Sequence, residues 1–171
     1  MLIKFNREEN TIFLDVDGVV ADFDAFIYEN LGSSFKNESD ETDAEMWNFI
    51  KSVPHFYSQL PRMDGAHELV NFARSLAQKV EFLTAIPRKV EIPTAESDKR
   101  VWLACHFGSD IPVRIGPYSR DKWLHCSPGD ILVDDRADNI HEWIHNGNGF
   151  GVLHKSTSMT KTILKSVVAV H

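Results

Sequence analysis

The sequence predicts an α/β fold built on a parallel β-sheet, and two regularities of the chain lead to that prediction. Short apolar runs, each about as long as a buried strand, recur through the sequence. Between them lie helix-length segments in which apolar residues are spaced three and four positions apart. Strands that alternate with helices form right-handed βαβ units around a parallel sheet. We therefore expect a three-layer, Rossmann-like architecture.

Each expected element follows from its local pattern, and glycines mark two of the helix ends. Gly108 follows the expected helix Asp98–Phe107, and the pair Gly147 and Gly149 follows the expected helix Ala137–His145. The last segment, Ser156 to Val170, has the spacing of an amphipathic helix that docks on the core. The expected strands are Thr11–Leu14, Val80–Leu83, Val113–Ile115, Ile131–Val133 and Phe150–Leu153. The expected helices between them are Asn71–Ala77, Asp98–Phe107 and Ala137–His145.

One region interrupts this alternation of strands and helices. The segment from Asp24 to Pro61 contains no strand-like run, is rich in aromatic residues, and includes an acidic, polar stretch from Ser33 to Asp43. We interpret residues 24–61 as a small helical cap inserted after the first strand, with residues 1–23 and 62–171 forming the core domain. The aromatic residues of the cap either line a binding pocket or pack the cap onto the core, and the sequence leaves both open.

The composition describes a protein with a hydrophobic core and no strong attraction for polyanions. Hydrophobic residues make up 43% of the 171 residues, more than a disordered chain contains. The formal net charge of −7 argues against long nucleic acid as a ligand, although a few local cations would still hold a small anion. Cys105 and Cys126 provide no disulfide framework. No stretch near the amino terminus is apolar enough for a signal or membrane span, so we expect a cytoplasmic monomer or homodimer that does not bind membranes.

The first expected strand ends in two carboxylates. Asp15 and Asp17 follow the apolar run Ile12-Phe13-Leu14, and Gly18 allows a bend directly after them. Two carboxylates crowded at the carboxyl end of a buried strand repel each other, and a bound cation would relieve that repulsion. In open α/β sheets this edge is where ligands bind, so the pair is a candidate functional site.

Polar residues suited to phosphate and metal chemistry follow three later strands. Thr84 comes after Val80–Leu83, and its hydroxyl suits a phosphate oxygen. Lys122 opens a short helix after the third strand, where its charge would neutralise both a phosphate and nearby carboxylates. Asp134 and Asp135 follow the fourth strand as a second carboxylate pair. Clusters of carboxylate oxygens suit a hard cation such as Mg²⁺, which also shares oxygens with substrate phosphates.

The order of these residues, Asp-x-Asp, Thr, Lys and then Asp-Asp, resembles that of the haloacid dehalogenase (HAD) superfamily of phosphohydrolases. Four stretches, DVDGVVADF, DKRVWLACHFG, RDKW and ILVDDRADN, resemble in particular the 5′(3′)-deoxyribonucleotidases within that superfamily. The resemblance covers about Thr11 to Asn139, and the expected cap follows the first strand as the family's helical cap does. It implies a HAD-like fold and a Mg²⁺-dependent phosphatase that hydrolyses (deoxy)ribonucleoside monophosphates to nucleoside and phosphate.

The resemblance also implies a role for each matching residue. Asp15 would be the nucleophile that forms an aspartyl-phosphate, and Asp17 would protonate the leaving oxygen and then activate water. Asp15, the backbone carbonyl of Asp17 and one acid of the Asp134/Asp135 pair would hold Mg²⁺, and the choice within that pair stays open. The residues expected to bind or face the phosphate are Thr84, Ala85, Lys99, Arg120 and Lys122. The aromatic residues expected to line the base pocket or stack on the base are Phe23, Trp47 and Phe56.

Two departures from the family pattern bear on base and sugar preference. Ala85 stands where a serine often follows the threonine, and the cap is shorter than in the animal deoxyribonucleotidases. Neither departure touches the residues that the resemblance assigns to phosphoryl transfer. Two other functions therefore stay open, namely a HAD phosphatase for another small phosphate ester and a non-catalytic module that binds Mg²⁺ and phosphate. The Asp15/Asp17 pair argues against the second, because a module without turnover has no chemical need for the second acid.

A separate motif near the carboxyl end matches a zinc-peptidase pattern. His141-Glu142-Trp143-Ile144-His145 has the spacing H-E-x-x-H, which puts both histidines on one face of a helix. A peptidase also needs a third zinc ligand. No acidic residue follows Glu142, and His154 is the only loose candidate. A half-buried helix on the outside of the sheet is the better interpretation.

Overall fold

The fold is a five-stranded parallel sheet flanked by helices. A computed structural model of the chain describes residues 3–32, 40–88, 91–116 and 118–169, without the side chains of residues 40–42 and 120. Within these ranges the strands form one sheet in the order β3-β2-β1-β4-β5, and every neighbouring pair is parallel. The strands are β1 (Thr11–Leu14), β2 (Lys79–Ala85), β3 (Val113–Gly116), β4 (Ile131–Asp134) and β5 (Phe150–Leu153). The predicted α/β class and parallel sheet are confirmed.

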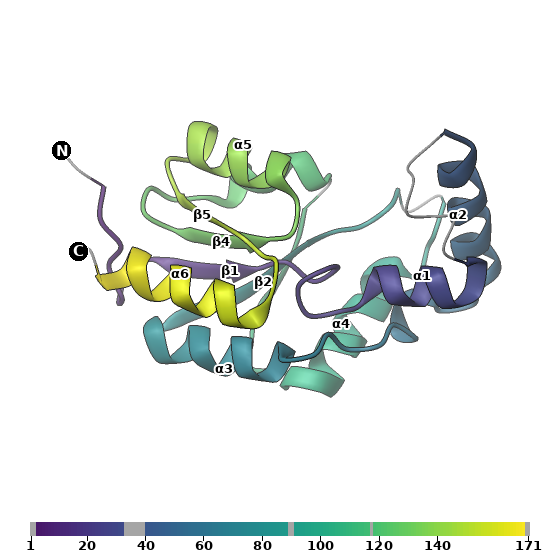
Figure 1. Cartoon of the computed structure of the whole chain (residues 1–171), viewed down its shortest axis with the longest axis horizontal. Coiled ribbons are helices and arrows are strands. Elements are labelled where there is room, and N and C mark those ends of the chain that lie inside the picture. Colours follow the sequence, from purple (N-terminus) through teal and green to yellow (C-terminus); the bar gives the residue numbers. More distant parts are fainter. Residues whose placement is uncertain (1–2, 33–39, 89–90, 117, 170–171) are drawn as a thin grey trace.

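Helices cover both faces of this sheet, which gives the predicted three layers. Figure 1 shows α5 on one face and α3 and α6 on the opposite face. The helices are α1 (Phe23–Leu31), α2 (Asp40–Ser52), α3 (Ala66–Leu76), α4 (Ala95–Phe107), α5 (Ala137–Gly147) and α6 (Thr157–Ala169). Two short 3₁₀ helices are η2 (Phe56–Ser58) and η3 (Ser119–His125). None of the helices in these ranges is long and apolar enough to cross a bilayer.

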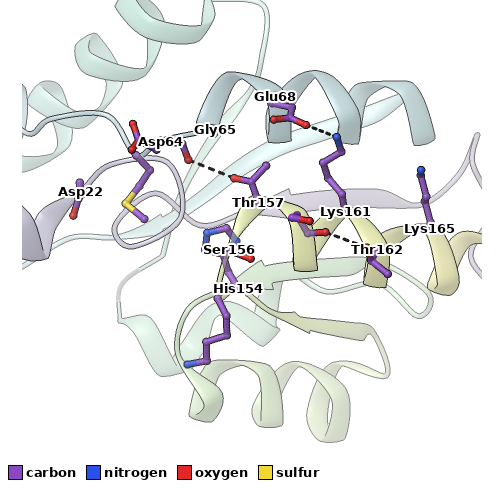
Figure 2. A pocket seen from close by; sticks show the side chains of 13 residues that line it. Asp22, Asp64, Gly65, Glu68, His154, Ser156, Thr157, Lys161, Thr162 and Lys165 are labelled. Atoms are coloured by element: carbon purple, nitrogen blue, oxygen red, sulfur yellow. Dashed lines mark hydrogen bonds and ion pairs between the residues drawn. The ribbon is translucent and has the colours of Figure 1, made fainter.

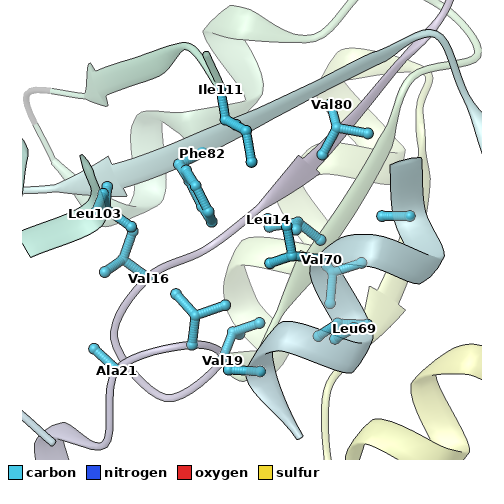
Figure 3. Packing of buried hydrophobic residues seen from close by; sticks show 14 of the residues in the cluster. Leu14, Val16, Val19, Ala21, Leu69, Val70, Val80, Phe82, Leu103 and Ile111 are labelled. Atoms are coloured by element: carbon cyan, nitrogen blue, oxygen red, sulfur yellow. The ribbon is translucent and has the colours of Figure 1, made fainter. Parts of the chain in front are cut away.

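The core follows from the alternation of side chains along β1. Leu14 belongs to the larger buried cluster, which packs under α3 and α4 and includes Leu69, Val70 and Phe82 (Figure 3). Phe13 points to the other face and packs edge-on against Trp143 of α5, with ring centroids 5.4 Å apart. Because both faces of β1 are buried, its sequence is a continuous apolar run with no polar face.

The boundaries of several elements differ from the predicted ones, most of all those of β2 and α3. β2 continues through Thr84 and Ala85, which were expected to follow the strand, because these residues pair with Ile115 and Gly116 of β3. α3 begins at Ala66, before the predicted start at Asn71, because Gly65 takes a left-handed φ of 75° and turns the chain into the helix. The first turn of α3 is largely polar, so the spacing of apolar residues in the sequence does not predict that turn.

The segment between β1 and α3 is helical, as its sequence predicts. The chain leaves and re-enters the core through two adjacent extended segments, in which the Asp22 amide donates to the Pro61 carbonyl at 2.8 Å. The Met63 amide donates to the Val20 carbonyl at 2.9 Å in the same place. The predicted polar stretch from Ser33 to Asp43 lies mostly outside the described residues. The division into a core and a cap, residues 24–61, stays a prediction.

Candidate active site at the carboxyl edge of the sheet

The carboxyl ends of β1 and β4 meet at the point where the strand order reverses. The chain runs from β1 to β2 and β3 on one side and returns to β4 and β5 on the other. Such a switch point opens a crevice beyond the strand ends. A cavity of about 760 Å³ lies there. The predicted site residues that line this cavity are Asp15, Asp17, Phe23, Trp47, Thr84, Ala85, Lys122 and Asp135.

Asp15 is held rigidly at the floor of this cavity. Its Oδ1 accepts a hydrogen bond from the Val16 amide at 2.7 Å and lies 2.7 Å from Nζ of Lys122. Burial raises the pKa of the Asp15 carboxyl well above its ordinary value, and the charge of Asp134 raises it further. Lys122 works in the opposite direction, because its positive charge stabilises the ionised carboxylate.

Lys122 is a buried cation shared by two carboxylates. Its side chain is 2% exposed, and its Nζ lies 2.7 Å from Asp15 Oδ1 and 2.7 Å from Asp134 Oδ2. Burial alone would lower the pKa of Lys122, but the charges of Asp15 and Asp134 outweigh burial and raise it. The lysine therefore stays charged and joins the ends of β1 and β4.

Asp134 and Asp135 have different surroundings. Both oxygens of Asp134 are engaged: Oδ2 accepts from Lys122, while Oδ1 accepts from the Arg136 amide at 2.9 Å. Nδ2 of Asn139 lies 3.1 and 3.0 Å from the two Asp134 oxygens. The Asp135 carboxylate contributes to none of these bonds. Burial and the adjacent charge of Asp134 raise its pKa to about 6.

These carboxylates form a candidate cation site. One oxygen from each of Asp15, Asp134 and Asp135 lies within 4.8 Å of the others, and no other such triplet of potential ligands occurs in the described part of the chain. A cluster that shares negative charge in a partly buried position is stabilised by a divalent ion. Burial raises the pKa values of Asp15 and Asp135, and the negative charge of Asp134 raises both further.

Gly18 makes room for the Asp135 carboxylate. Its φ is 78°, and a Cβ at this position would collide with the Asp135 carboxylate. We expect Gly18→Ala to displace Asp135 and strain the turn after β1, which would lower the metal-dependent phosphatase activity that the sequence resemblance implies at least about tenfold. Gly32→Ala is the matched control, since Gly32 also has a positive φ but no atom within 4 Å of the added Cβ. Equal kinetic losses in the two variants would contradict the steric explanation.

Asp17 forms an ion pair with Lys99. Nζ of Lys99 donates to Asp17 Oδ2 at 2.5 Å, to Thr84 Oγ1 at 2.9 Å and to the Ala85 carbonyl at 2.9 Å. The lysine side chain is 2% exposed, and these acceptors use its three protons. It does not line the cavity but contacts Asp17 and Thr84, which do, and its place on the phosphate side stays a prediction. The Asp17 Oδ1 atom is buried, and no described residue donates a hydrogen bond to it.

The aromatic residues predicted for the base pocket divide into two groups. Phe23 and Trp47 line the cavity. Phe56 does not: it is fully buried, and its ring packs against Phe23, Phe26, Phe49 and Tyr57. Its predicted position on the base is therefore corrected to a core position. The neighbouring Tyr57 lines the cavity instead, and burial raises its pKa.

Several residues near the cavity carry no obvious sequence signal. Asn139 and Ser119 are hydrogen-bonded to each other, and Ser119 lines the cavity while Asn139 holds Asp134. Arg136 also lines the cavity, with its guanidinium paired to Asp138 at 3.1 Å. The nearest sequence signal is the side-chain carboxamide of Asn139, which lies within the stretch ILVDDRADN. The side chain of Arg120, a predicted phosphate residue, lies outside the described residues.

A second cavity of similar size lies between α3 and α6 (Figure 2). Its volume is about 770 Å³, so size does not distinguish the two cavities. None of the residues predicted for catalysis, metal binding or substrate binding lines it, and Lys161 is paired with Glu68 across it. The chemistry predicted from the sequence therefore gathers at the edge of the sheet.

Comparison with known proteins bears on the fold. The sequence matches no protein-family model and no curated protein. A haloacid dehalogenase-like hydrolase from Burkholderia xenovorans superposes with a TM-score of 0.50 at 15% identity, over 88% of this chain and 84% of its own. The HAD domain of the Legionella pneumophila effector Lem4 gives 0.47 at 14% identity, over 96% of this chain and 97% of its own. A Streptococcus pneumoniae hydrolase gives 0.49 at 13% identity, over 91% and 98%. The Burkholderia match and the strand order together show that this chain has a haloacid dehalogenase-like fold.

Proposed function

We propose that the protein is a Mg²⁺-dependent phosphomonoesterase that acts on nucleoside monophosphates through an aspartyl-phosphate on Asp15. One observation carries this proposal. The Asp15 carboxylate is held by Lys122 at the floor of a cavity, with oxygens of Asp134 and Asp135 within 4.8 Å. A carboxylate nucleophile beside a lysine and further acids is the arrangement that phosphoryl transfer through an acyl phosphate requires.

The acidic residues fit a hard divalent cation. We propose Asp15, Asp135 and the backbone carbonyl of Asp17 as its protein ligands. Asp135 is the better ligand of its pair because the Asp134 oxygens already accept bonds from Lys122, Asn139 and the Arg136 amide. When bound, Mg²⁺ supplies positive charge that offsets the repulsion between the phosphate and the carboxylates.

The protein groups divide the remaining work. The ionised Asp15 carboxylate attacks phosphorus while Lys122 and the Thr84 hydroxyl bind phosphoryl oxygens. The Thr84 Oγ1 accepts from Lys99 and donates to the Ala85 carbonyl at 3.2 Å, so its proton would turn from that long bond to a phosphate oxygen when phosphate binds. Asp17 then protonates the leaving oxygen and takes a proton from the water that hydrolyses the acyl phosphate. Its buried, unsatisfied Oδ1 is the oxygen that would carry this proton.

Aromatic side chains on the cap side of the cavity support a planar leaving group. Phe23, Trp47 and Tyr57 line the cavity. Stacking of a base on one aromatic ring is worth about 1–3 kcal/mol. A nucleoside is therefore favoured over an aliphatic phosphate ester as the substrate.

Phosphate release from a substrate panel tests the proposal. We expect hydrolysis of dUMP or dTMP that depends on Mg²⁺ and stops with EDTA, with slower turnover of sugar phosphates. If only sugar phosphates are hydrolysed, the substrate assignment fails and the mechanism stands. If no ester is hydrolysed while BeF₃⁻ still binds at Asp15, the protein is a non-catalytic Mg²⁺ and phosphate-binding module.

Trp47 provides a separate test of the base pocket. We expect Trp47→Ala to raise KM for dUMP about 5- to 150-fold, which corresponds to the loss of one stacking contact. The kinetics of p-nitrophenyl phosphate, which does not reach as far into the cap, should change less than threefold. Equal changes for the two substrates would show that Trp47 supports the cap and does not contact the base.

The pKa of Asp135 gives a pH-dependent test of the cation site. Its folded-state pKa of about 6 exceeds the ordinary value of 3.8, so the folded state binds this proton more tightly than the unfolded chain. The metal-free protein should therefore lose stability as pH rises from about 4 to about 6. At pH 7.5, Mg²⁺ should raise the thermal midpoint of the wild type, because it binds the ionised folded site.

Asp135→Asn should reduce the pH effect, because the raised pKa of Asp15 still contributes to it, and should remove the Mg²⁺ response. The matched control is Asp138→Asn, because Asp138 also lines the cavity but is paired with Arg136 and has a lowered pKa. Differential scanning calorimetry with and without Mg²⁺ measures both variants. A Mg²⁺ response that survives in Asp135→Asn would move the ion to other ligands.

A further inference from the structure

α5 carries a pair of histidines that the proposed phosphatase chemistry does not use. His141 and His145 are one helical turn apart, and their ring centroids lie 4.2 Å apart. Both residues are exposed, and the His141 side chain is 65% exposed. Two imidazoles at this spacing on one helix face can bind the same ion.

We propose that His141 and His145 form a binding site for one divalent transition-metal ion of the Zn²⁺, Ni²⁺ and Cu²⁺ class. Imidazole nitrogen favours these ions, whereas the carboxylate oxygens at the end of β1 and β4 favour Mg²⁺. The two sites therefore differ in metal preference.

The helix presents the pair in a fixed geometry. Trp143 lies between the two histidines in sequence but on the opposite side of α5, where it is fully buried. Its Nε1 donates to the Asp130 carbonyl at 3.2 Å, and its ring packs against Phe13. Because this anchor fixes the rotation of α5, the histidines face outwards together without any ordering of a loop.

Glu142 adds negative charge beside the pair. Its Oε1 lies 3.7 Å from Nδ1 of His141, which favours a cation bound there. Glu142 is itself held through Oε2 by the Asn146 side chain.

The site is open, which distinguishes it from the zinc centre of a peptidase. His154 was the loose candidate for a third ligand, but it is buried and bonded to Thr160 Oγ1 at 2.8 Å. It also lines the separate cavity between α3 and α6 (Figure 2). The histidine pair therefore provides two protein ligands, and water completes the coordination.

Titration calorimetry of the full chain with Ni²⁺, in excess Mg²⁺ to occupy the acidic cluster, tests this site. We expect one Ni²⁺ per chain, and at least tenfold weaker binding in both His141→Ala and His145→Ala. His67→Ala is the matched control, because His67 is an exposed histidine on α3, on the opposite face of the sheet (Figure 1). Its Ni²⁺ affinity should equal that of the wild type.

Spectroscopy and activity separate this site from the phosphatase site. The Cu²⁺ spectrum of the wild type should show two imidazole nitrogens, and the signal should be lost in the double variant His141→Ala/His145→Ala. Mg²⁺-dependent phosphate release should be unchanged in that variant, so the histidine site can fail or stand independently of the proposed activity. Ni²⁺ binding of unchanged affinity and stoichiometry in the double variant would overturn the proposal.

Discussion

Asp15→Asn is expected to lower the rate of phosphate release by about 10⁴- to 10⁶-fold, because the amide cannot form the acyl phosphate. The structure predicts that this loss is chemical and not a folding defect. Burial raises the pKa of Asp15, so the site already disfavours a charge at this position. An uncharged amide of nearly the same shape should leave the metal-free protein as stable as the wild type, or more stable.

Single-turnover kinetics and urea unfolding should be measured together on this variant. Asp110→Asn is the matched control, since Asp110 is an exposed aspartate paired with Arg74 at 2.8 Å, away from the cavity. The control should retain wild-type activity. Retention of more than about a tenth of the wild-type rate by Asp15→Asn would assign the nucleophile to another group or to water.

Lys122→Met is expected to destabilise the protein by about 3–5 kcal/mol, the usual cost of removing one partner from a buried ion pair. The methionine fills a similar volume but leaves Asp15 and Asp134 facing each other without a positive charge. Lys51→Met is the matched control, because the Lys51 side chain is 43% exposed and its Nζ lies 3.8 Å from Glu91 Oε2 at the surface. Its loss should cost less than about 1 kcal/mol.

The pH dependence of this destabilisation identifies its cause. Without the Lys122 charge, which lowers the pKa of Asp15 in the wild type, the folded state should bind a proton at Asp15 still more tightly than the unfolded chain does. The deficit relative to the wild type should therefore shrink as pH falls from 8 to 5. Mg²⁺ at neutral pH should also reduce it. Urea unfolding at several pH values measures this, and a deficit that is independent of both pH and Mg²⁺ would indicate a packing defect.

Lys99 shows why position in the chain does not reveal the role of a buried charge. The sequence resemblance puts it on the phosphate side, and in the structure its Nζ donates to Asp17, Thr84 and the Ala85 carbonyl. Which atoms its ammonium group reaches depends on how α4 packs against β2. No local pattern in Asp98–Phe107 contains that information.

The aromatic residues give a similar lesson. Phe56 and Tyr57 are neighbours in a short 3₁₀ helix, and both are large enough to stack on a base. The surrounding rings of Phe26 and Phe49 enclose Phe56, so Tyr57 is the one that faces the cavity. Composition predicts an aromatic lining here, and side-chain packing selects its members.

The strands, the helices and the acidic strand ends follow from local properties of the chain. Neighbouring residues decide whether a segment has a periodic apolar face and where that segment ends. The partners of Lys122, the different surroundings of Asp134 and Asp135, and the position of Tyr57 at the cavity depend on residues far apart in the chain. Those contacts form only when β1 and β4 pair and the inserted helices pack beside them. Long-range packing, which no short stretch of sequence encodes, therefore decided which of the predicted residues meet at the site.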